Sequence, residues 1–214
     1  ANVSHELKTP ITVIATSLKV LEMEVGQQKW IDKAQTQTEK LTELVNSLVT
    51  LSRMDEEDSP LKMEPFPVSD AVSETAESFR DLALSRGHPL ELTVQPELTY
   101  RGDEYAVRQL TSILLDNAVK YAAPESPITL TLEKTDRQAR LTVSNPGDPI
   151  PPEHLAHLFE RFYRADASRG EKSGFGLGLA IADTIAREHK GMLKAESDTA
   201  STRFTFTMPL RKQA

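Results

Sequence analysis

Two stripes of apolar residues with heptad spacing occupy the first fifty positions, and they restrict the fold more than any other feature. Alternating steps of four and three residues predict two long helices, each with one apolar seam. Gly26 separates the stripes, so we expect a helical hairpin with a short connection. The seam positions are Leu7, Ile11, Ile14, Leu18, Leu21 and Val25, followed by Ile31, Ala34, Thr38, Leu41, Val45 and Leu48.

This predicted hairpin is too small to be stable alone. A hairpin of about 50 residues falls below the size at which one chain usually closes a core. Two copies packed as a four-helix bundle would cover both seams, and we therefore expect a homodimer. The alternative is that the hairpin packs against the rest of its own chain.

From residue 68 onward the periodicity becomes that of mixed helices and strands. The preceding stretch, residues 55–67, carries acidic side chains and three prolines, which favours a linker leading into an edge strand. The predicted helices cover residues 69–86, 103–122 and 176–189, and the predicted strands cover residues 90–95, 128–134, 139–145, 191–197 and 203–209.

The short gaps between predicted strands indicate how these elements assemble. Such gaps imply antiparallel hairpins, so the helices should cover one face of a mixed sheet. We expect an α+β protein: a helical hairpin at residues 1–57, then an α/β sandwich at residues 58–214. Residues 146–175 have little periodicity, which is typical of a functional lid or a disordered insert.

The composition excludes several classes of protein. A formal net charge of −7 argues against a sequence-independent nucleic-acid binder, which normally presents a basic face. The chain contains no cysteine, so disulfides and thiolate metal sites are absent. No run of about 18 apolar residues occurs, and we therefore expect no membrane-spanning segment in this sequence.

The first string that indicates chemistry is SHELKTP, residues 4–10. In the heptad register His5 lies beside the seam, open to solvent, and Thr9 is one turn further along the same face. A neutral imidazole can act as a nucleophile near pH 7, and Glu6 could hold its tautomer and accept its proton. Pro10 removes one helical hydrogen bond and should kink the helix just past His5.

This string, followed by an apolar heptad, resembles the H-box of the bacterial sensor histidine kinases. The resemblance implies that His5 is the phosphoacceptor, that Glu6 is its base and that Thr9 serves phosphatase activity toward the partner. It also implies a homodimer whose partner is the receiver domain of a response regulator. In that family the core faces the cytoplasm at the bacterial inner membrane, so we expect membrane attachment only through segments upstream of this sequence.

A second string, LLDNAVKYA at residues 114–122, resembles the N-box of the same kinases and of the ATPase superfamily that includes gyrase and Hsp90. The resemblance implies that Asn117 binds Mg²⁺, that Lys120 meets phosphate oxygens and that Tyr121 packs near the nucleotide. A neutral oxygen ligand suits a hard cation, and an ammonium offsets phosphate charge. Ile113 replaces a second Asn that the family often carries, so one usual metal ligand is absent.

A third segment, residues 143–166, resembles the G1 box running into the F box. Asn145 stands where the family has an Asp that accepts a hydrogen bond from the adenine amino group. Its amide oxygen can accept the same bond without charge assistance. Gly147 matches the first glycine of the box, Pro149 replaces the second, and Ile150 remains in register.

A fourth string, GFGLGLAIA at residues 174–182, matches the G2 box, whose glycines let backbone N–H groups approach phosphates. Near the end, residues 201–204 resemble the closing GTxF of the family, with Ser in place of Gly. Phe162 of the F box either clamps the lid or fills the core. The nucleotide contacts that these segments imply are Ile150, Phe162, Arg169, Lys172, Gly174, Gly176, Gly178 and Thr202.

The four boxes cover nearly the whole chain in the order of the family, and they imply one reaction. With ATP and Mg²⁺ bound, the core would phosphorylate its own His5 and pass the phosphate to an Asp of the regulator. Two alternatives stay open. The departures at Ile113, Asn145 and Pro149 would suit a phosphatase-biased core that binds nucleotide but scarcely phosphorylates itself. A non-enzymatic dimerisation scaffold would bind no ATP.

Overall fold

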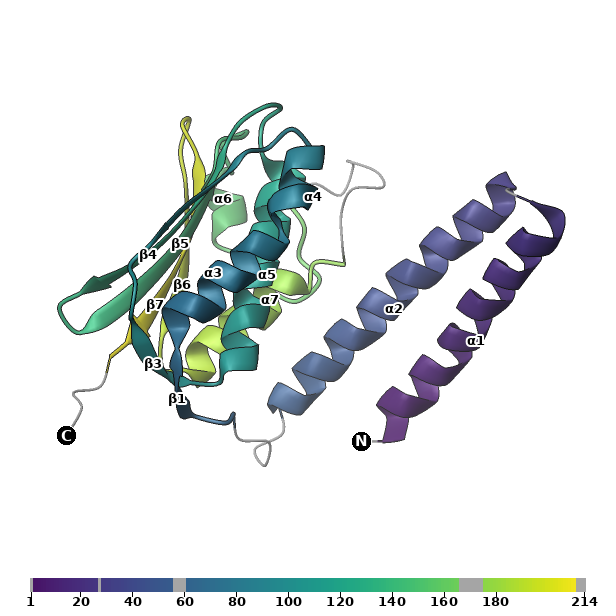
Figure 1. Ribbon diagram of the computed structural model, residues 1–214, viewed down its shortest axis with the longest axis horizontal. Coiled ribbons are helices and arrows are strands. Elements are labelled where there is room, and N and C mark those ends of the chain that lie inside the picture. The colour runs from purple at the N-terminus through teal and green to yellow at the C-terminus, as the bar shows by residue number, and fades with distance from the viewer. Residues whose placement is uncertain (1, 27, 56–60, 166–174, 211–214) are drawn as a thin grey trace. The chain divides into compact units, whose positions relative to one another are not determined.

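The computed structural model describes residues 2–26, 28–55, 61–165 and 175–210 (Figure 1). In the first two stretches the side chains are described for residues 11–26 and 28–51. The chain divides into two compact units, Ala1–Ser59 and Pro60–Ala214. Each unit has its own architecture.

The first unit is a hairpin of two helices, α1 (Asn2–Val25) and α2 (Lys29–Asp55). Gly26 ends α1 with φ +75°, a conformation that glycine adopts without steric cost, and its N–H bonds to the Glu22 carbonyl at 2.9 Å. Gln35 of α2 donates to the Glu22 carboxylate at 2.9 Å. The two helices therefore make direct side-chain contact near their connection.

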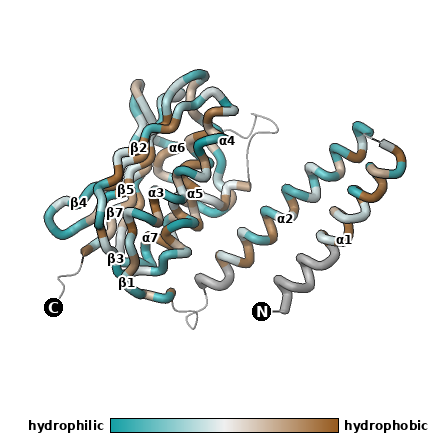
Figure 2. The backbone as a smooth tube through the Cα atoms, in the orientation of Figure 1, coloured by the Kyte–Doolittle hydropathy of each residue, from teal (hydrophilic) through white to brown (hydrophobic). Residues whose placement is uncertain are grey.

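The apolar seam of the hairpin is only half covered. Apolar residues recur along both helices (Figure 2), and some of them are buried, among them Ile11, Ile31, Val45 and Leu51. Other seam positions remain 41–49% exposed, namely Ile14, Leu21, Leu41 and Leu48. One hairpin thus buries part of its apolar surface and leaves a second row without cover.

The second unit contains two sheets. Strands β1 (Glu64–Pro67) and β3 (Thr99–Gly102) form a small antiparallel pair. The main sheet has five strands in the order β2-β4-β5-β7-β6, with only the β2–β4 pair parallel. Its strands are β2 (Leu90–Val94), β4 (Ile128–Thr135), β5 (Gln138–Asn145), β6 (Met192–Ser197) and β7 (Thr202–Pro209).

Helices α3 (Val68–Ser78), α5 (Glu104–Tyr121) and α7 (Gly178–Glu188) cover one face of the main sheet (Figure 1). Two shorter helices are α4 (Arg80–Ser85) and α6 (Pro152–Leu155). The helix–sheet interface consists of fully buried side chains, among them Leu110, Leu114, Leu115, Ile128, Leu130, Leu141, Ile185 and Phe206. The predicted α+β class, with a hairpin followed by an α/β sandwich, is confirmed.

Three local features differ from the expectation. The single helix predicted over residues 69–86 is broken at Phe79, whose N–H bonds to the Ala76 carbonyl three residues earlier and tightens the turn. Strand β1 lies inside the stretch predicted as a linker. Strand β3 was not predicted, because four residues with one buried aromatic side chain, Tyr100, give almost no periodicity.

A buried histidine ties α7 to the start of α5. His189 is 3% exposed and lies just after α7. Its Nδ1 lies 2.8 Å from the Ile185 carbonyl, so Nδ1 carries the hydrogen, and Nε2 accepts the N–H of Asp103 at 2.9 Å. A Cβ on Gly102 would lie 2.7 Å from the ring, so only glycine fits there. This geometry requires a neutral imidazole.

Burial lowers the pKa of His189 from its ordinary value of 6.5, although the Ile185 carbonyl and the nearby charges of Asp103 and Glu188 oppose the shift. A lowered pKa means that below about pH 6.5 the unfolded chain binds a proton that the folded chain does not. The contribution of neutral His189 to the free energy of unfolding is therefore complete above about pH 6.5. This contribution is lost as the pH falls toward the pKa that His189 has in the folded chain.

We predict that the second unit loses unfolding free energy as the pH falls below about 6.5, and that His189→Gln reduces this loss. Glutamine keeps an acceptor near the Asp103 N–H but cannot titrate. Chemical denaturation at several pH values measures the effect. Parallel pH profiles for the two proteins would contradict the assignment.

Candidate functional site

The predicted N-box occupies the last turns of α5. This helix begins under an N-cap, because the Asp103 carboxylate accepts the Ala106 N–H at 2.9 Å. At its other end Asn117 and Lys120 are half-buried and Tyr121 is 52% exposed. The Lys120 ammonium lies 2.5 Å from the Asp116 carboxylate, one turn earlier. The ammonium of Lys120 is therefore held at the end of α5 by an ion pair with Asp116.

Ile113 and Asn117 share one face of α5, a turn apart. This face points at the start of α7, because a Cβ on Gly178 would lie 3.4 Å from Ile113 Cγ2. Ile113 therefore offers a methyl group where the family often places a second amide oxygen. The residues described by the structure contain no cluster of three or more His, Cys, Asp or Glu side chains that could hold a metal ion.

The segment after β5 rests on the end of α5. The Pro146 carbonyl accepts the Ala123 N–H at 2.8 Å, just past the last turn of the helix. A Cβ on Gly147 would lie 2.8 Å from the Tyr121 carbonyl oxygen, closer than a side chain can approach. A glycine is needed here because two backbones meet. The fold thus joins the predicted G1 box to the N-box.

Asn145, the last residue of β5, is 4% exposed. Its Nδ2 donates to the Pro146 carbonyl at 3.2 Å, and this bond orients the amide so that its oxygen remains an acceptor for a ligand. In the sheet Asn145 pairs with Thr202 of β7, which in turn pairs with Ser197 of β6. The ends of three strands therefore place an amide and two hydroxyls in one row.

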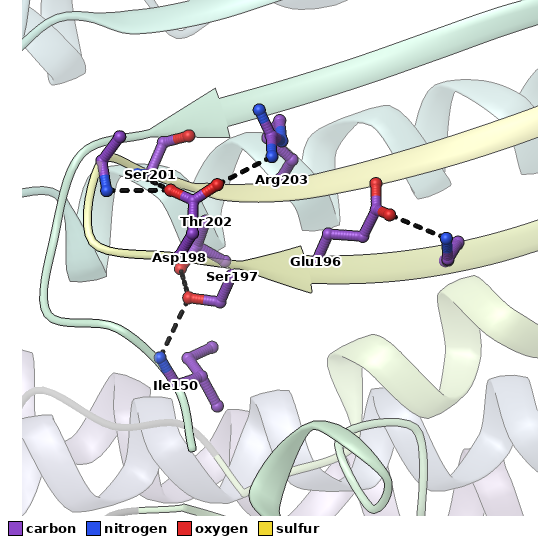
Figure 3. Close-up of polar contacts among 9 residues, drawn as sticks. Ile150, Glu196, Ser197, Asp198, Ser201, Thr202 and Arg203 are labelled. Atoms are coloured by element: carbon purple, nitrogen blue, oxygen red, sulfur yellow. Dashed lines mark hydrogen bonds and ion pairs between the residues drawn. The ribbon is translucent and has the colours of Figure 1, made fainter. Parts of the chain in front are cut away.

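Figure 3 shows how this row meets the G1 segment. The Ser197 hydroxyl accepts the Ile150 N–H at 2.9 Å and lies 2.8 Å from the Thr202 hydroxyl. Thr202 is 6% exposed. Sequence reasoning singled out Ile150 and Thr202 but missed Ser197. The strand alternation places Ser197 on the inner face, but nothing in the sequence predicts its contact with Ile150.

The turn between β6 and β7 is closed by Asp198 (Figure 3). Its carboxylate accepts the backbone N–H groups of Ala200 and Ser201 at 2.8 and 3.0 Å and binds Arg203 at 2.9 Å. The Ser201 and Ala200 bonds, with the Arg203 charge, hold the pKa of Asp198 below its ordinary value. The turn that delivers Thr202 is therefore fixed by its own local contacts.

The predicted G2 glycines lie against the segment after α6. The Phe162 N–H donates to the Gly176 carbonyl at 2.9 Å. Gly176 has φ +72°, and a Cβ on it would lie 2.6 Å from the Tyr163 carbonyl oxygen. Gly178 is the first residue of α7, and Phe162 is 59% exposed, so its ring does not fill the core.

The remaining predicted residues cannot be placed in this site. Arg169, Lys172 and Gly174 lie outside the described residues. His5, Glu6 and Thr9 belong to α1, and only the backbone of that part of the helix is described.

The geometry of the second unit agrees with an independent comparison of families. Residues 102–212, just over half of the chain, match the family described as "Histidine kinase-, DNA gyrase B-, and HSP90-like ATPase". Residues 1–57 match the "His Kinase A (phospho-acceptor) domain". The chain belongs to the sensor histidine kinases. It is a catalytic core of that family, a phosphoacceptor domain followed by an ATPase domain, and the predicted family and enzyme class are confirmed.

Curated relatives of this kinase core come from several bacteria. The sensor protein DltS of Streptococcus agalactiae serotype V is 33% identical over 210 residues, which cover 98% of this chain and 53% of DltS. The sensor histidine kinase CusS of Escherichia coli O157:H7 is 35% identical over 216 residues, covering 99% of this chain and 45% of CusS. The chain thus spans about half the length of these curated relatives.

A solved structure supports the fold. Full-length ShkA, crystallised in complex with AMPPNP, superposes with a TM-score of 0.82 at 25% identity, covering 100% of this chain and 46% of ShkA. Among the described helices, none combines the length and apolarity that crossing a lipid bilayer requires.

The close approach at Gly176 leads to a prediction about ATP binding. A side chain at positive φ costs about 1–2 kcal/mol wherever it is placed, and at Gly176 it would also collide with the Phe162–Tyr163 backbone. We expect Gly176→Ala to weaken ATP binding about tenfold or more, since each 1.4 kcal/mol of lost binding free energy raises the dissociation constant tenfold. Calorimetric titration of the chain with Mg-ATP measures this loss.

The matched control is Gly87→Ala. Gly87 has φ +81°, but the nearest atom to its added Cβ is 3.9 Å away. This variant should lose stability without losing ATP affinity. Equal ATP affinities for the two variants would show that the Gly176 contact is not part of the site.

Proposed function

We propose that this kinase core transfers the γ-phosphate of ATP to His5 and then to an aspartate of a response-regulator receiver domain. The observation that carries the proposal is the seating of the Asn145–Gly147 segment on the end of α5, beside Thr202. This arrangement joins three of the predicted nucleotide motifs. The same chain carries His5 in α1, inside the match to the phosphoacceptor domain.

Nucleotide binding is assigned first to the row at the strand ends. The Asn145 oxygen would accept a hydrogen bond from the adenine amino group, and the Thr202 hydroxyl would lie beside the base. Gly147, Ile150, Tyr121 and the exposed Phe162 ring would line the same side. The likeness to ShkA supports this assignment, because AMPPNP is a non-hydrolysable analogue of ATP.

The phosphate end is assigned to α5 and α7. Lys120 would exchange Asp116 for phosphate oxygens; a partly exposed pair of this kind is worth about 0–1 kcal/mol, so the exchange costs little. Gly176, Gly178 and the N-terminus of α7 would offer backbone N–H groups. Arg169, Lys172 and Gly174 are proposed as further contacts from the adjoining segment.

The donor set fits one Mg²⁺ ion with few protein ligands. The Asn117 amide oxygen is a hard ligand of the kind this ion prefers, whereas Ile113 supplies none. Magnesium usually keeps several waters and binds phosphate oxygens, so a single amide ligand is compatible with it. When bound, the ion would neutralise the negative charge that develops on the phosphates of the leaving ADP.

At the phosphoacceptor, the lone-pair nitrogen of neutral His5 would attack the γ-phosphorus in line. The N–P bond forms as the bond from the γ-phosphorus to the β,γ-bridging oxygen breaks, and ADP leaves. Glu6 would accept the proton from the other ring nitrogen. The phosphoryl group then passes to the regulator's carboxylate, and Thr9 would position water for dephosphorylation of that regulator.

We further propose how the core is assembled. The domain boundary would lie near residues 57–58, and the part of the predicted linker that precedes β1 would act as the hinge that brings the ATP-binding domain to His5, because β1 itself is paired with β3. In the whole protein this core would face the cytoplasm at the bacterial inner membrane, attached through segments outside the chain. The homodimer would form through the uncovered row on the hairpin, Ile14, Leu21, Leu41 and Leu48, as a four-helix bundle.

The dimer can be tested by placing a charge in that row. Leu21 is 48% exposed in a single hairpin and would become buried in the bundle. We expect Leu21→Asp to raise the dimer dissociation constant at least about a hundredfold, since an unpaired buried charge costs several kcal/mol. Light scattering across a dilution series gives the mass, and Gln37→Asp, at an exposed polar position, is the control.

The kinase reaction is tested with γ-labelled ATP and Mg²⁺. We expect acid-labile, base-stable label on the wild type and none on His5→Gln, because only the imidazole is the acceptor. His157→Gln, which removes an exposed histidine of the second unit, should label normally. Absence of label on a folded wild type that binds ATP would overturn autophosphorylation and favour the phosphatase-biased core. Absence of ATP binding would favour the scaffold.

A further inference from the structure

Ser197 joins three segments that meet at the proposed base-binding row. Its hydroxyl accepts the Ile150 N–H at 2.9 Å and lies 2.8 Å from the Thr202 hydroxyl, as Figure 3 shows. Across the sheet, Thr202 lies between Ser197 and Asn145 in register. One serine on β6 therefore contacts both the G1 segment and the hydroxyl that would face the base.

The β6–β7 turn does not need this hydroxyl. The Asp198 carboxylate closes the turn through two backbone N–H groups and Arg203. The paired strands β6 and β7 continue from the turn for six residues on the β6 side. Removing the Ser197 oxygen would thus leave the hairpin intact, so its contacts with Ile150 and Thr202 need another explanation.

A hydroxyl has one hydrogen to give and two lone pairs. One Ser197 lone pair is taken by the Ile150 N–H, and its hydrogen can be given to Thr202. Thr202 would then be free to turn its own hydrogen toward a ligand. In the same row Asn145 presents an oxygen, because its NH₂ group is bonded to Pro146. The row would offer one acceptor and one donor side by side.

This order of donor and acceptor distinguishes purines. The edge of adenine carries an amino donor next to a ring-nitrogen acceptor, whereas guanine carries a carbonyl acceptor next to an N–H donor. A site that presents an acceptor and then a donor pairs with both groups of adenine. When guanine occupies the same site, the acceptor and the donor of the protein both lack a partner. Unpaired buried polar groups are costly, so the order gives selectivity.

We propose that Ser197 is a positioning residue for base recognition: it sets Thr202 as a hydrogen-bond donor and fixes the G1 segment at Ile150. The proposal rests on the proposed ATP-binding function. Ser197 does not touch the nucleotide itself. It acts through Thr202, and selectivity for adenine over guanine depends on its hydroxyl.

The experiment compares the affinities of the full chain for Mg-ATP and Mg-GTP by calorimetric titration. We expect Ser197→Ala to weaken ATP binding about tenfold, the loss expected when a hydrogen bond is removed and its partners stay buried, and to weaken GTP binding less, so that the ATP-to-GTP affinity ratio falls. Ser197→Thr keeps the hydroxyl and should keep the preference for ATP.

The matched control is Thr205→Val. Thr205 and Thr142 form another hydroxyl pair between β5 and β7, at 3.2 Å, three residues along the strand from Thr202. Alternation along the strand places Thr205 on the opposite face of the sheet. This variant should lower the unfolding temperature about as much as Ser197→Ala does while leaving the ATP-to-GTP ratio unchanged.

The outcomes separate the two proposals. If the wild type prefers ATP and Ser197→Ala keeps the full preference, or weakens ATP and GTP equally, the role of Ser197 is overturned and the proposed function stands. If the folded wild type binds neither nucleotide, the proposed function falls and the role of Ser197 falls with it. A preference lost in Ser197→Ala but retained in Thr205→Val and Ser197→Thr supports the inference.

Discussion

The burial of α5 against the main sheet is the contact on which the rest of the ATPase unit depends. Leu110, Leu114 and Leu115 of this helix are fully buried. Because the buried face holds the helix in place, both of its ends are fixed and can position the segments that contact them. At the start, Asp103 caps the helix and its N–H meets His189, which fixes the end of α7. At the other end the Tyr121 carbonyl meets the backbone at Gly147. The core therefore positions the site without sharing residues with it.

The hairpin follows a different energetic logic. Its two helices bury one row of apolar side chains against each other and leave another row 41–49% exposed. Exposed apolar surface of this kind is stabilised only by a second copy or another partner, since a pair of helices has too little interior. The ATPase unit closes its own core, whereas the phosphoacceptor unit leaves an apolar row exposed. In the proposed homodimer a second copy would cover this row, and the hairpin packing could then change while the nucleotide site keeps its structure.

The sequence allowed the elements with long periodic patterns to be predicted, and failed where short-range geometry decides. The two hairpin helices and the five strands of the main sheet were anticipated because their patterns run over many residues. Strand β3 has only four residues, and the break at Phe79 depends on one tightened turn. The role of His189 cannot be predicted from the sequence, because its partner Asp103 is 86 residues away in the chain. The contact of Ser197 was missed for the same reason, since its partner Ile150 lies 47 residues away in the chain.

The departures from the family pattern divide into two kinds when their surroundings are considered. Asn145 keeps an oxygen available through its bond to Pro146, so the loss of charge changes the strength of one hydrogen bond and not its direction. Ile113 instead removes an oxygen altogether and presents a methyl group toward Gly178. Asn145 removes one negative charge from the proposed base site, whereas Ile113 exchanges a neutral amide for a methyl group and leaves the charge unchanged. In the proposed site the first departure therefore lowers the repulsion that the phosphates would meet, and the second removes a metal ligand without any such gain.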